Sequence, residues 1–151
     1  MILGMHATKL VVRDADAAER FYAAIGLKLV ARNTGGEKEV RQKQAWMSVT
    51  GDTASHMLIL SEFLETPAPP LPAWPREVWL ALNVSDVEAL LAAAEGAGGE
   101  VVRPGEDRPE HGVRAAVVAD VEGHLIEIVG PMAAGVGGPV SDPLARGGQE
   151  H

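Results

Sequence analysis

Cysteine is absent from this 151-residue chain. Its absence excludes disulfide bonds, thiolate metal sites and cysteine nucleophiles, although it leaves the redox compartment open. Long hydrophobic runs are also missing, since no stretch approaches the roughly 18 apolar residues that a membrane helix needs. The opening residues, MILGMHATKL, become polar too early for a signal peptide. We therefore expect a cytoplasmic protein with no membrane partner.

Basic residues are scarce relative to acidic ones. Lys and Arg number 13 against 21 for Asp and Glu, which gives a formal net charge of −8. This balance provides no basic surface to displace counterions from phosphates, so nucleic acid is excluded as a partner. The acidic surface favours solubility and, more weakly, the attraction of cationic ligands. Hydrophobic residues make up 46% of the chain, which is typical of one compact globular domain.

The chain contains an internal repeat. Residues 7–30 align with residues 79–102 at a constant offset of 72, and residues 56–60 align with residues 124–128 at an offset of 68. The period is too long, and the copies are too few, for a solenoid. We therefore predict two copies of one supersecondary unit that pack against each other.

The sequence of each copy predicts a strand, a helix and three further strands. Alternating apolar residues indicate the first strand, and Asp14 or Asp86 then provides the cap of a helix. Gly26 and Gly98 occupy the positions at which a left-handed residue ends a helix. The predicted helices span about 15–25 and 86–96, and the strands that follow span about 27–33, 42–50, 56–62, 100–103, 113–119 and 124–129.

The repeat divides the chain into a first βαβββ module at 1–63 and a second at 78–131. Between them, residues 64–77 contain five prolines and are predicted to form a linker or surface loop. Residues 132–151 are rich in Gly and Pro, and we expect a flexible tail. The predicted class is α+β, with a curved mixed sheet around a cavity and the helices on its outer face.

Two segments carry a family resemblance, the opening LVVRDADAAERFYAAIGLKLV and the closing ADVEGHLIEIVG. Together with the two βαβββ copies, they resemble the vicinal oxygen chelate superfamily, which includes glyoxalase I, extradiol dioxygenases and bleomycin- and fosfomycin-resistance proteins. The resemblance covers about residues 5–131 and implies a single glyoxalase-like domain. It is poorly specific for activity, because function depends on the site and not on the scaffold.

The resemblance implies four metal-ligand positions, one on the first and one on the last strand of each module. Such a site needs carboxylate and imidazole donors, with open positions for substrate oxygens. The residues at these positions are Ala7, Ile59, Trp79 and Glu127. Only Glu127 is a suitable donor, so we predict no metal cofactor. The alternative is a metal-dependent enzyme of the glyoxalase or dioxygenase type that uses His6 and Glu127.

His6 lies one residue before the first ligand position. Strand side chains alternate, so His6 should face the opposite side of the sheet, unless a bulge at Ala7 turns it inward. A third ligand would then have to come from a partner chain or from one of Glu62, His56, His111 and His124. The simpler alternative is that the strand-end histidines are solvated.

The concave face of the sheet should form a mostly apolar wall with a few polar anchors, as small-molecule pockets do. Trp79 is expected to stack on a planar or cationic ligand, with Trp46 beside it and Trp74 in the linker as a lid. Alternatively, these tryptophans plug the sheet or a dimer seam. The predicted ligand-binding residues are Trp79, Trp46, Lys9, Asn83, Arg114 and Ile59.

Glu127 is the candidate catalytic residue. A carboxylate on an apolar face is costly to bury without a partner. It therefore requires a ligand, a water, Asn83, or an ion pair with Lys9 or Arg114. With a ligand, it would act as a general base or as an anchor for a cation or hydroxyl.

Two hypotheses follow. The first is a protein, akin to the antibiotic-binding resistance proteins, that binds a small molecule in the sheet cavity without the usual metal. The second is a glyoxalase- or dioxygenase-type enzyme. A homodimer is expected in either case, and the sequence leaves open whether modules pair within one chain or across the dimer.

Overall fold

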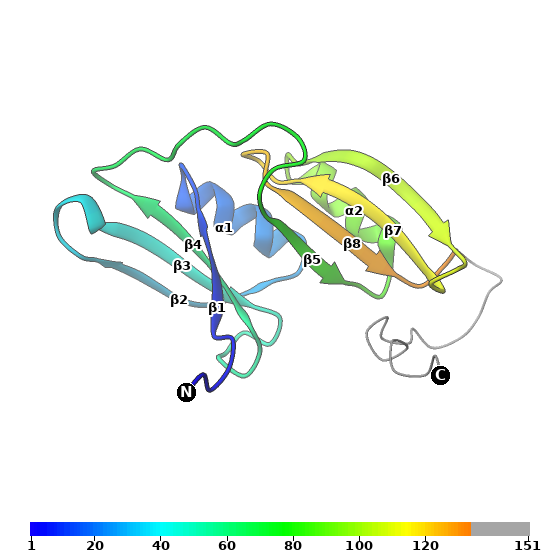
Figure 1. Ribbon diagram of the computed structural model, residues 1–151, viewed down its shortest axis with the longest axis horizontal. Helices are drawn as coiled ribbons and strands as arrows, with labels where there is room; N and C mark the ends of the chain where they lie inside the picture. Colours follow the sequence, from blue (N-terminus) through cyan, green and yellow to red (C-terminus); the bar gives the residue numbers. More distant parts are fainter. Residues whose placement is uncertain (134–151) are drawn as a thin grey trace.

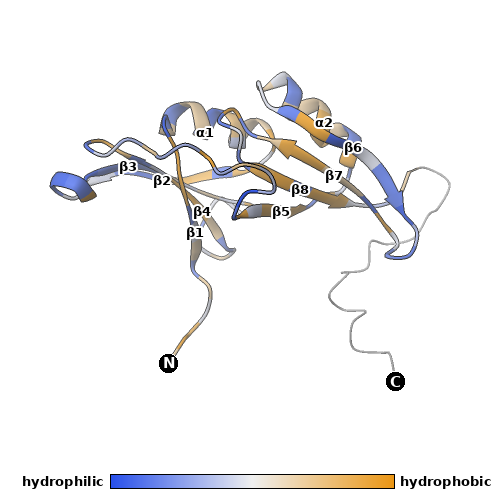
Figure 2. Ribbon diagram, turned by 45° about the horizontal axis from the view of Figure 1, so that its top comes forward, coloured by the Kyte–Doolittle hydropathy of each residue, from blue (hydrophilic) through white to orange (hydrophobic). Residues whose placement is uncertain are grey.

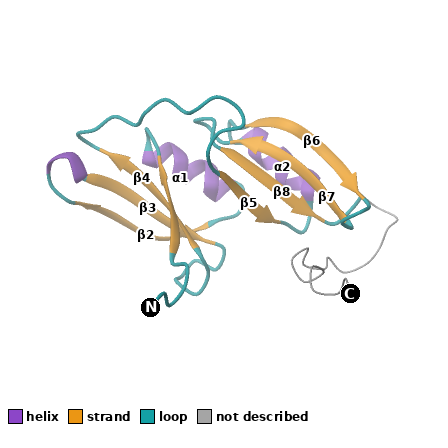
Figure 3. Cartoon of the chain, in the orientation of Figure 1, coloured by secondary structure: helices purple, strands orange, loops and turns teal. Residues whose placement is uncertain are grey.

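The computed structural model describes residues 1–133. The first half contains β1 (Ala7–Val11), α1 (Ala15–Ala24), β2 (Lys28–Gly35), a 3₁₀ helix η1 (Lys38–Val40), β3 (Gln42–Ser48) and β4 (Met57–Phe63). The second half contains β5 (Trp79–Asn83), α2 (Val87–Gly96), β6 (Glu100–Arg108), β7 (Val113–Ala119) and β8 (Leu125–Gly130). Each half therefore has the predicted βαβββ order (Figure 3). The predicted tail lies outside the described residues from position 134 onward.

Each module forms its own four-stranded mixed sheet, in the orders β1-β4-β3-β2 and β5-β8-β7-β6. The first strand of each module pairs parallel with the last, and the other pairs are antiparallel. Both helices cover the same side of the two sheets (Figures 1 and 2). The predicted α+β class is thus confirmed, with two sheets in place of one continuous sheet. We call the sheet side away from the helices the open face.

The helix boundaries follow from the capping residues that the sequence indicated. Asp14 accepts a hydrogen bond from the N–H of Ala17 at 3.0 Å, and Asp86 caps α2 in the same way. The helices are followed by Gly26 and Gly98, whose φ angles of +118° and +92° suit glycine. Local sequence signals therefore set both helices. Within residues 1–133, no helix is long and apolar enough to span a membrane.

Strand β6 is longer than predicted, because it continues through Pro104 to Arg108. It is the edge strand of its sheet, so the missing N–H of Pro104 need not remove a ladder hydrogen bond. The register with β7 shifts on both sides of Arg103. These irregularities re-aim side chains in the second half of the strand.

One apolar core is shared by the two modules and lies between the sheets and the helices (Figure 2). Phe21 of α1 contacts the backbone of the second module at Gly99. A Cβ atom at this position would lie 2.7 Å from Cε2 of Phe21 and 2.6 Å from the carbonyl oxygen of Ala119. The close approach of the modules therefore requires glycine at position 99. Fully buried members of the core include Val12, Phe21, Tyr22, Met47, Leu60, Val118, Ile126 and Ile128.

Polar contacts also join the modules. The hydroxyl of Tyr22 donates to Oδ2 of Asp120 at 2.8 Å, and both side chains are buried. The carboxylate of Glu122, in the same turn as Asp120, accepts from the backbone N–H of Arg13 at 2.7 Å. The turn before β8 is thereby fixed to the start of α1.

We expect Tyr22→Phe to lower the free energy of unfolding by about 1–3 kcal/mol, because it removes one donor from a buried carboxylate. Urea denaturation monitored by circular dichroism measures the change. The control is Thr66→Val, which removes an exposed hydroxyl that donates to Glu39 and should change stability by less than about 0.5 kcal/mol. Equal effects for the two variants would contradict a structural role for the Tyr22 hydroxyl.

Candidate functional site

The candidate site is a cavity of about 330 Å³ on the open face of the second module, which we call the open-face pocket. It lies beside β5 and β8, where the parallel register sets Glu127 opposite Ala81. Trp79 is two residues before Ala81 on β5, so both side chains face the same side as Glu127. The charged and aromatic residues of the lining are Trp74, Trp79, Arg103, Glu106, Arg108 and Glu127.

Trp79 is held in place by its surroundings. Its ring packs on a small apolar cluster of Val117, Ala119 and Leu125 on the open face. Its indole N–H donates to the carbonyl of Pro75. The ring is therefore positioned as a wall of the pocket, and its N–H already has a partner.

Trp74 forms the outer side of the same pocket. It belongs to residues 64–78, which connect β4 to β5 along one edge of the molecule without helix or strand (Figure 3). Its ring centroid lies 5.3 Å from that of Trp79, with an angle of 59° between the planes. The guanidinium carbon of Arg103 lies 5.3 Å from the Trp74 ring centroid, which is a cation–π arrangement. Trp74 is 51% exposed, so its ring is accessible from solvent.

The carboxylate of Glu127 is partly buried, and within residues 1–133 it makes no hydrogen bond or ion pair. Neither Lys9 nor Arg114, the two expected ion-pair partners, contacts the Glu127 carboxylate. Lys9 donates to Gln42 at 3.2 Å on the other sheet, and Arg114 pairs with Glu88 of α2 at 2.7 Å on the helix side. Glu127 is thus a carboxylate in a pocket with an unused hydrogen-bonding capacity.

The other predicted ligand-binding residues lie elsewhere. Trp46, Lys9 and Ile59 share the open face of the first module, where β3 and β4 place Trp46 directly beside Ile59. The indole N–H of Trp46 donates to Gln44 at 3.1 Å. Asn83 is exposed at the end of β5 and is not part of the pocket lining. Of the predicted ligand-binding residues, only Trp79 therefore lines the open-face pocket.

Sequence reasoning missed three charged residues of the pocket, Arg103, Glu106 and Arg108. They lie on β6, with Arg103 at the expected end of the strand and Glu106 and Arg108 beyond it. Pro104 and Gly105 are typical of a turn, and the residues beyond them lack an apolar alternation. No period marks these residues in the sequence, because the charged positions 103, 106, 107 and 108 do not alternate.

His6 lies beside the open face of the first module, although the bulge expected to turn it inward is absent. The β1–β4 register runs from Ala7 to Val11 without a shift, so there is no bulge at Ala7. His6 precedes the strand, and alternation does not govern its direction. Its ring instead contacts Trp46 edge-on, with 6.3 Å between ring centroids. His6 therefore lies with Trp46 of the first module.

Residues 4–128 match the Glyoxalase/Bleomycin resistance protein/Dioxygenase superfamily. The chain belongs to this superfamily. Since the match covers most of the chain, it includes both modules and the open-face pocket. No curated protein matches the sequence.

Solved structures of superfamily proteins share this fold. A glyoxalase family protein from Bacillus cereus is 22% identical, with a TM-score of 0.75, and the match covers 88% of this chain and 97% of that one. Glyoxalase I from Leishmania major is 21% identical, with a TM-score of 0.66 and coverages of 84% and 86%. Glyoxalase I from Zea mays is 15% identical, with a TM-score of 0.69, and the match covers 85% of this chain and 46% of that one. At these identities, the likeness shows the fold alone.

The residues of this superfamily member do not fit the family's divalent metal. Among residues 1–133, no three His, Asp or Glu side chains are grouped closely enough to hold a metal ion. The positions that the family resemblance implies for metal ligands carry Ala7, Ile59, Trp79 and Glu127, and only the last has a donor atom that metals prefer.

His124 is already engaged at the module boundary. Its Nδ1 lies 2.9 Å from Oδ2 of Asp120. Burial lowers the pKa of His124, but the hydrogen bond and the negative charge of Asp120 outweigh it, so the pKa lies above the ordinary 6.5. Burial raises the pKa of Asp120, but hydrogen bonds from His124 and Tyr22 and the nearby charge bring it below 3.8.

These two shifts predict a pH window for stability. The raised pKa of His124 adds to the free energy of unfolding. This contribution is fully present below pH 6.5 and is lost as the pH rises through the folded-state pKa. The lowered pKa of Asp120 gives a contribution that is present above pH 3.8 and is lost as the pH falls through the folded-state pKa. The pair should therefore stabilise the fold most between these values.

We expect the difference in unfolding free energy between the native chain and His124→Gln to be largest near pH 5 and to shrink toward about pH 9. Urea titrations at a series of pH values measure it. His56→Gln is the matched control, because His56 occupies the equivalent repeat position but is exposed. A difference in unfolding free energy that grows with pH would contradict the pairing of His124 with Asp120.

Proposed function

We propose that this protein binds a small planar cation in the open-face pocket without a metal ion, as a cytoplasmic homodimer. The observation that carries the proposal is the carboxylate of Glu127, which has no partner within residues 1–133 and lies in a pocket walled by Trp79 and Trp74. Partial burial of such a group costs free energy until a cation or donor reaches it. A ligand that carries a positive charge on a flat ring system satisfies both parts of the site.

The position of Arg103 supports the planar shape of the ligand. Its guanidinium is itself a planar cation, and it already lies over the ring of Trp74. A ligand cation of similar shape would replace this side chain on the ring and approach Glu127. The remaining lining cation, Arg108, is paired with Glu106 at 3.2 Å, so its charge is partly compensated.

The arrangement of the open faces supports a homodimer. Both open faces point to the same side of the molecule and do not face each other within the chain (Figures 1 and 2). A cavity enclosed between two open faces therefore requires a second copy of the chain. In such a dimer, Trp46 and Lys9 of the partner copy would cover the pocket that contains Trp79 and Glu127.

A second candidate function is catalysis with Glu127 as a general base. The same unpaired carboxylate favours it, since a partly buried carboxylate that lines a pocket can take a proton from a bound substrate. This alternative uses the same residues and does not require a metal ligand set.

Proflavine, a planar cation, should quench the tryptophan fluorescence of the protein in a saturable way, whereas anionic 9-anthracenecarboxylate should bind far more weakly. Glu127→Gln should raise the Kd for proflavine about tenfold, as expected for the loss of a hydrogen bond to a charged group. Glu110→Gln, at an exposed position outside the pocket, is the charge-matched control. Identical binding by Glu127→Gln and Glu110→Gln would refute the proposed role of Glu127.

Metal analysis of protein purified without a histidine tag, after incubation with zinc, nickel, manganese or iron(II), should find far less than one metal per chain. The physical reason is the lack of donors at three of the four family positions. About one bound metal per chain, lost in His6→Ala, would instead establish the metal-dependent alternative with His6 and Glu127.

A further inference from the structure

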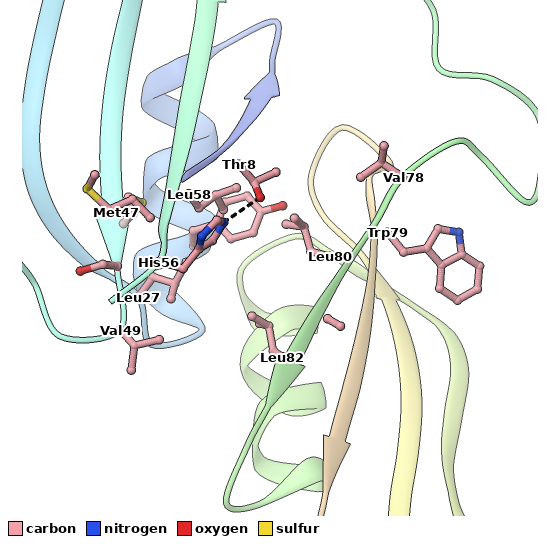
Figure 4. A pocket seen from close by; sticks show the side chains of 14 residues that line it. Thr8, Leu27, Met47, Val49, His56, Leu58, Val78, Trp79, Leu80 and Leu82 are labelled. Carbon is pink, nitrogen blue, oxygen red and sulfur yellow. Dashed lines mark hydrogen bonds between the residues drawn. The ribbon is translucent and has the colours of Figure 1, made fainter. Parts of the chain in front are cut away.

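A second cavity, also of about 330 Å³, lies at the boundary between the two modules. Its lining includes Leu58 of β4, and Leu80 and Leu82 of β5, together with Thr8 and His56 at its mouth. Figure 4 shows Leu80 and Leu82 pointing toward Thr8 and His56, while the ring of Trp79 points away from them. We call this the seam cavity. It lies on the opposite side of β5 from the open-face pocket.

The seam cavity exists because the sheets are separate. β1 and β5 are edge strands at the boundary, and within the described residues each pairs only with the last strand of its own module. No ladder of hydrogen bonds draws the two edges together. Leu80 and Leu82 are consequently only partly buried against the shared core.

The polar groups of the lining have partners. Oγ1 of Thr8 and Nε2 of His56 lie 2.9 Å apart, and Nδ1 of His56 lies 3.3 Å from the carbonyl oxygen of Met5. The hydroxyl of Tyr22 donates to Asp120, and that of Ser48 donates to the carbonyl of Asp52. The lining contains no Asp, Glu, Lys or Arg. The interior is therefore apolar, and the hydrogen bond between Thr8 and His56 lies at its exposed mouth, where a ligand could replace it.

Cavity size and chemistry indicate the kind of ligand. Apolar cavities are poor sites for water and take up apolar molecules, and ligand pockets are frequent at boundaries between domains. The cavity volume of about 330 Å³ corresponds to about eleven water molecules at roughly 30 Å³ each. A charged ligand would find no counterion, unlike in the open-face pocket with its Glu127.

We propose that the seam cavity binds a small neutral apolar molecule with a single hydroxyl group. Its hydrocarbon part lies among Leu58, Leu80 and Leu82. Its hydroxyl, which both donates and accepts, enters between Thr8 and His56 and replaces their direct hydrogen bond. This proposal does not rest on the function proposed for the open-face pocket, because the linings of the two sites have only Trp79 of β5 in common.

The test uses 1-octanol as the probe and methyl NMR of the full chain as the readout. Saturable shifts are expected at the methyl groups of Leu58, Leu80 and Leu82, with no comparable shifts from octylammonium. Thr8→Val, which removes the hydroxyl and keeps the shape, should weaken octanol binding about three- to tenfold. Its matched control is Thr50→Val, at an exposed position outside the cavity, which should bind like the native chain.

Leu82→Trp should fill the cavity and abolish octanol binding while proflavine still binds at the open-face pocket. Glu127→Gln should weaken proflavine binding and leave octanol binding unchanged. A wrong proposal for one site is therefore distinguishable from a wrong proposal for the other. The proposal is overturned if the leucine methyl shifts do not saturate, if octylammonium binds equally well, or if Thr8→Val and Thr50→Val bind alike. It is also overturned if intermolecular contacts show that a second copy of the chain fills the cavity.

Discussion

The hydrogen bond from Tyr22 to the buried carboxylate of Asp120 fixes how the two modules lie relative to each other. No strand pairing joins the sheets within the described residues, so this task falls to side chains from α1 and from the turn before β8. The carboxylate accepts from its own module through the backbone N–H groups of Glu122 and His124 and the ring of His124, and docking adds the Tyr22 hydroxyl from the other module. The seam cavity is defined by this docking, since residues of both modules line it.

The contact between the modules is asymmetric although the modules are copies of one unit. At the repeat offset of 72, the first module's Phe21 and Tyr22 correspond to Ala93 and Ala94 of the second. Large aromatic rings on one side therefore meet small residues on the other, and Gly99 completes the space for Phe21. This difference in size makes the pairing of the two halves specific, because shape complementarity requires one partner of each kind.

The open faces have diverged in the same manner. Ala7 and Ile59 of the first module correspond to Trp79 and Glu127 of the second. The second module thus acquires both an aromatic wall and a carboxylate, whereas the first keeps small or aliphatic residues at these positions. The chemistry of the open-face pocket is concentrated on one half of the repeat, and the other half offers mainly Trp46, His6 and Lys9 around its own face.

Much of this organisation could be predicted, because it depends on local rules. The alternation of β5 and β8 predicted that Trp79 and Glu127 share a face, and Asp14 and Asp86 predicted where the helices begin. Features that depend on tertiary geometry could not be predicted. Arg103 reaches the pocket through an irregular edge strand, and His6 contacts Trp46 because it lies before the strand begins. Likewise, Arg114 pairs with a helix residue that no strand pattern reveals.

Strand β5 is only five residues long, and it places the ring of Trp79 on the open face and the side chains of Leu80 and Leu82 in the seam cavity. An insertion or deletion of one residue within it would turn Trp79 toward the helices and the two leucines toward the open face. Both cavities would be lost in a single event, whereas the loop at residues 64–78 can absorb changes in length. The tolerance of this protein to insertions should therefore change abruptly at the boundary between that loop and β5.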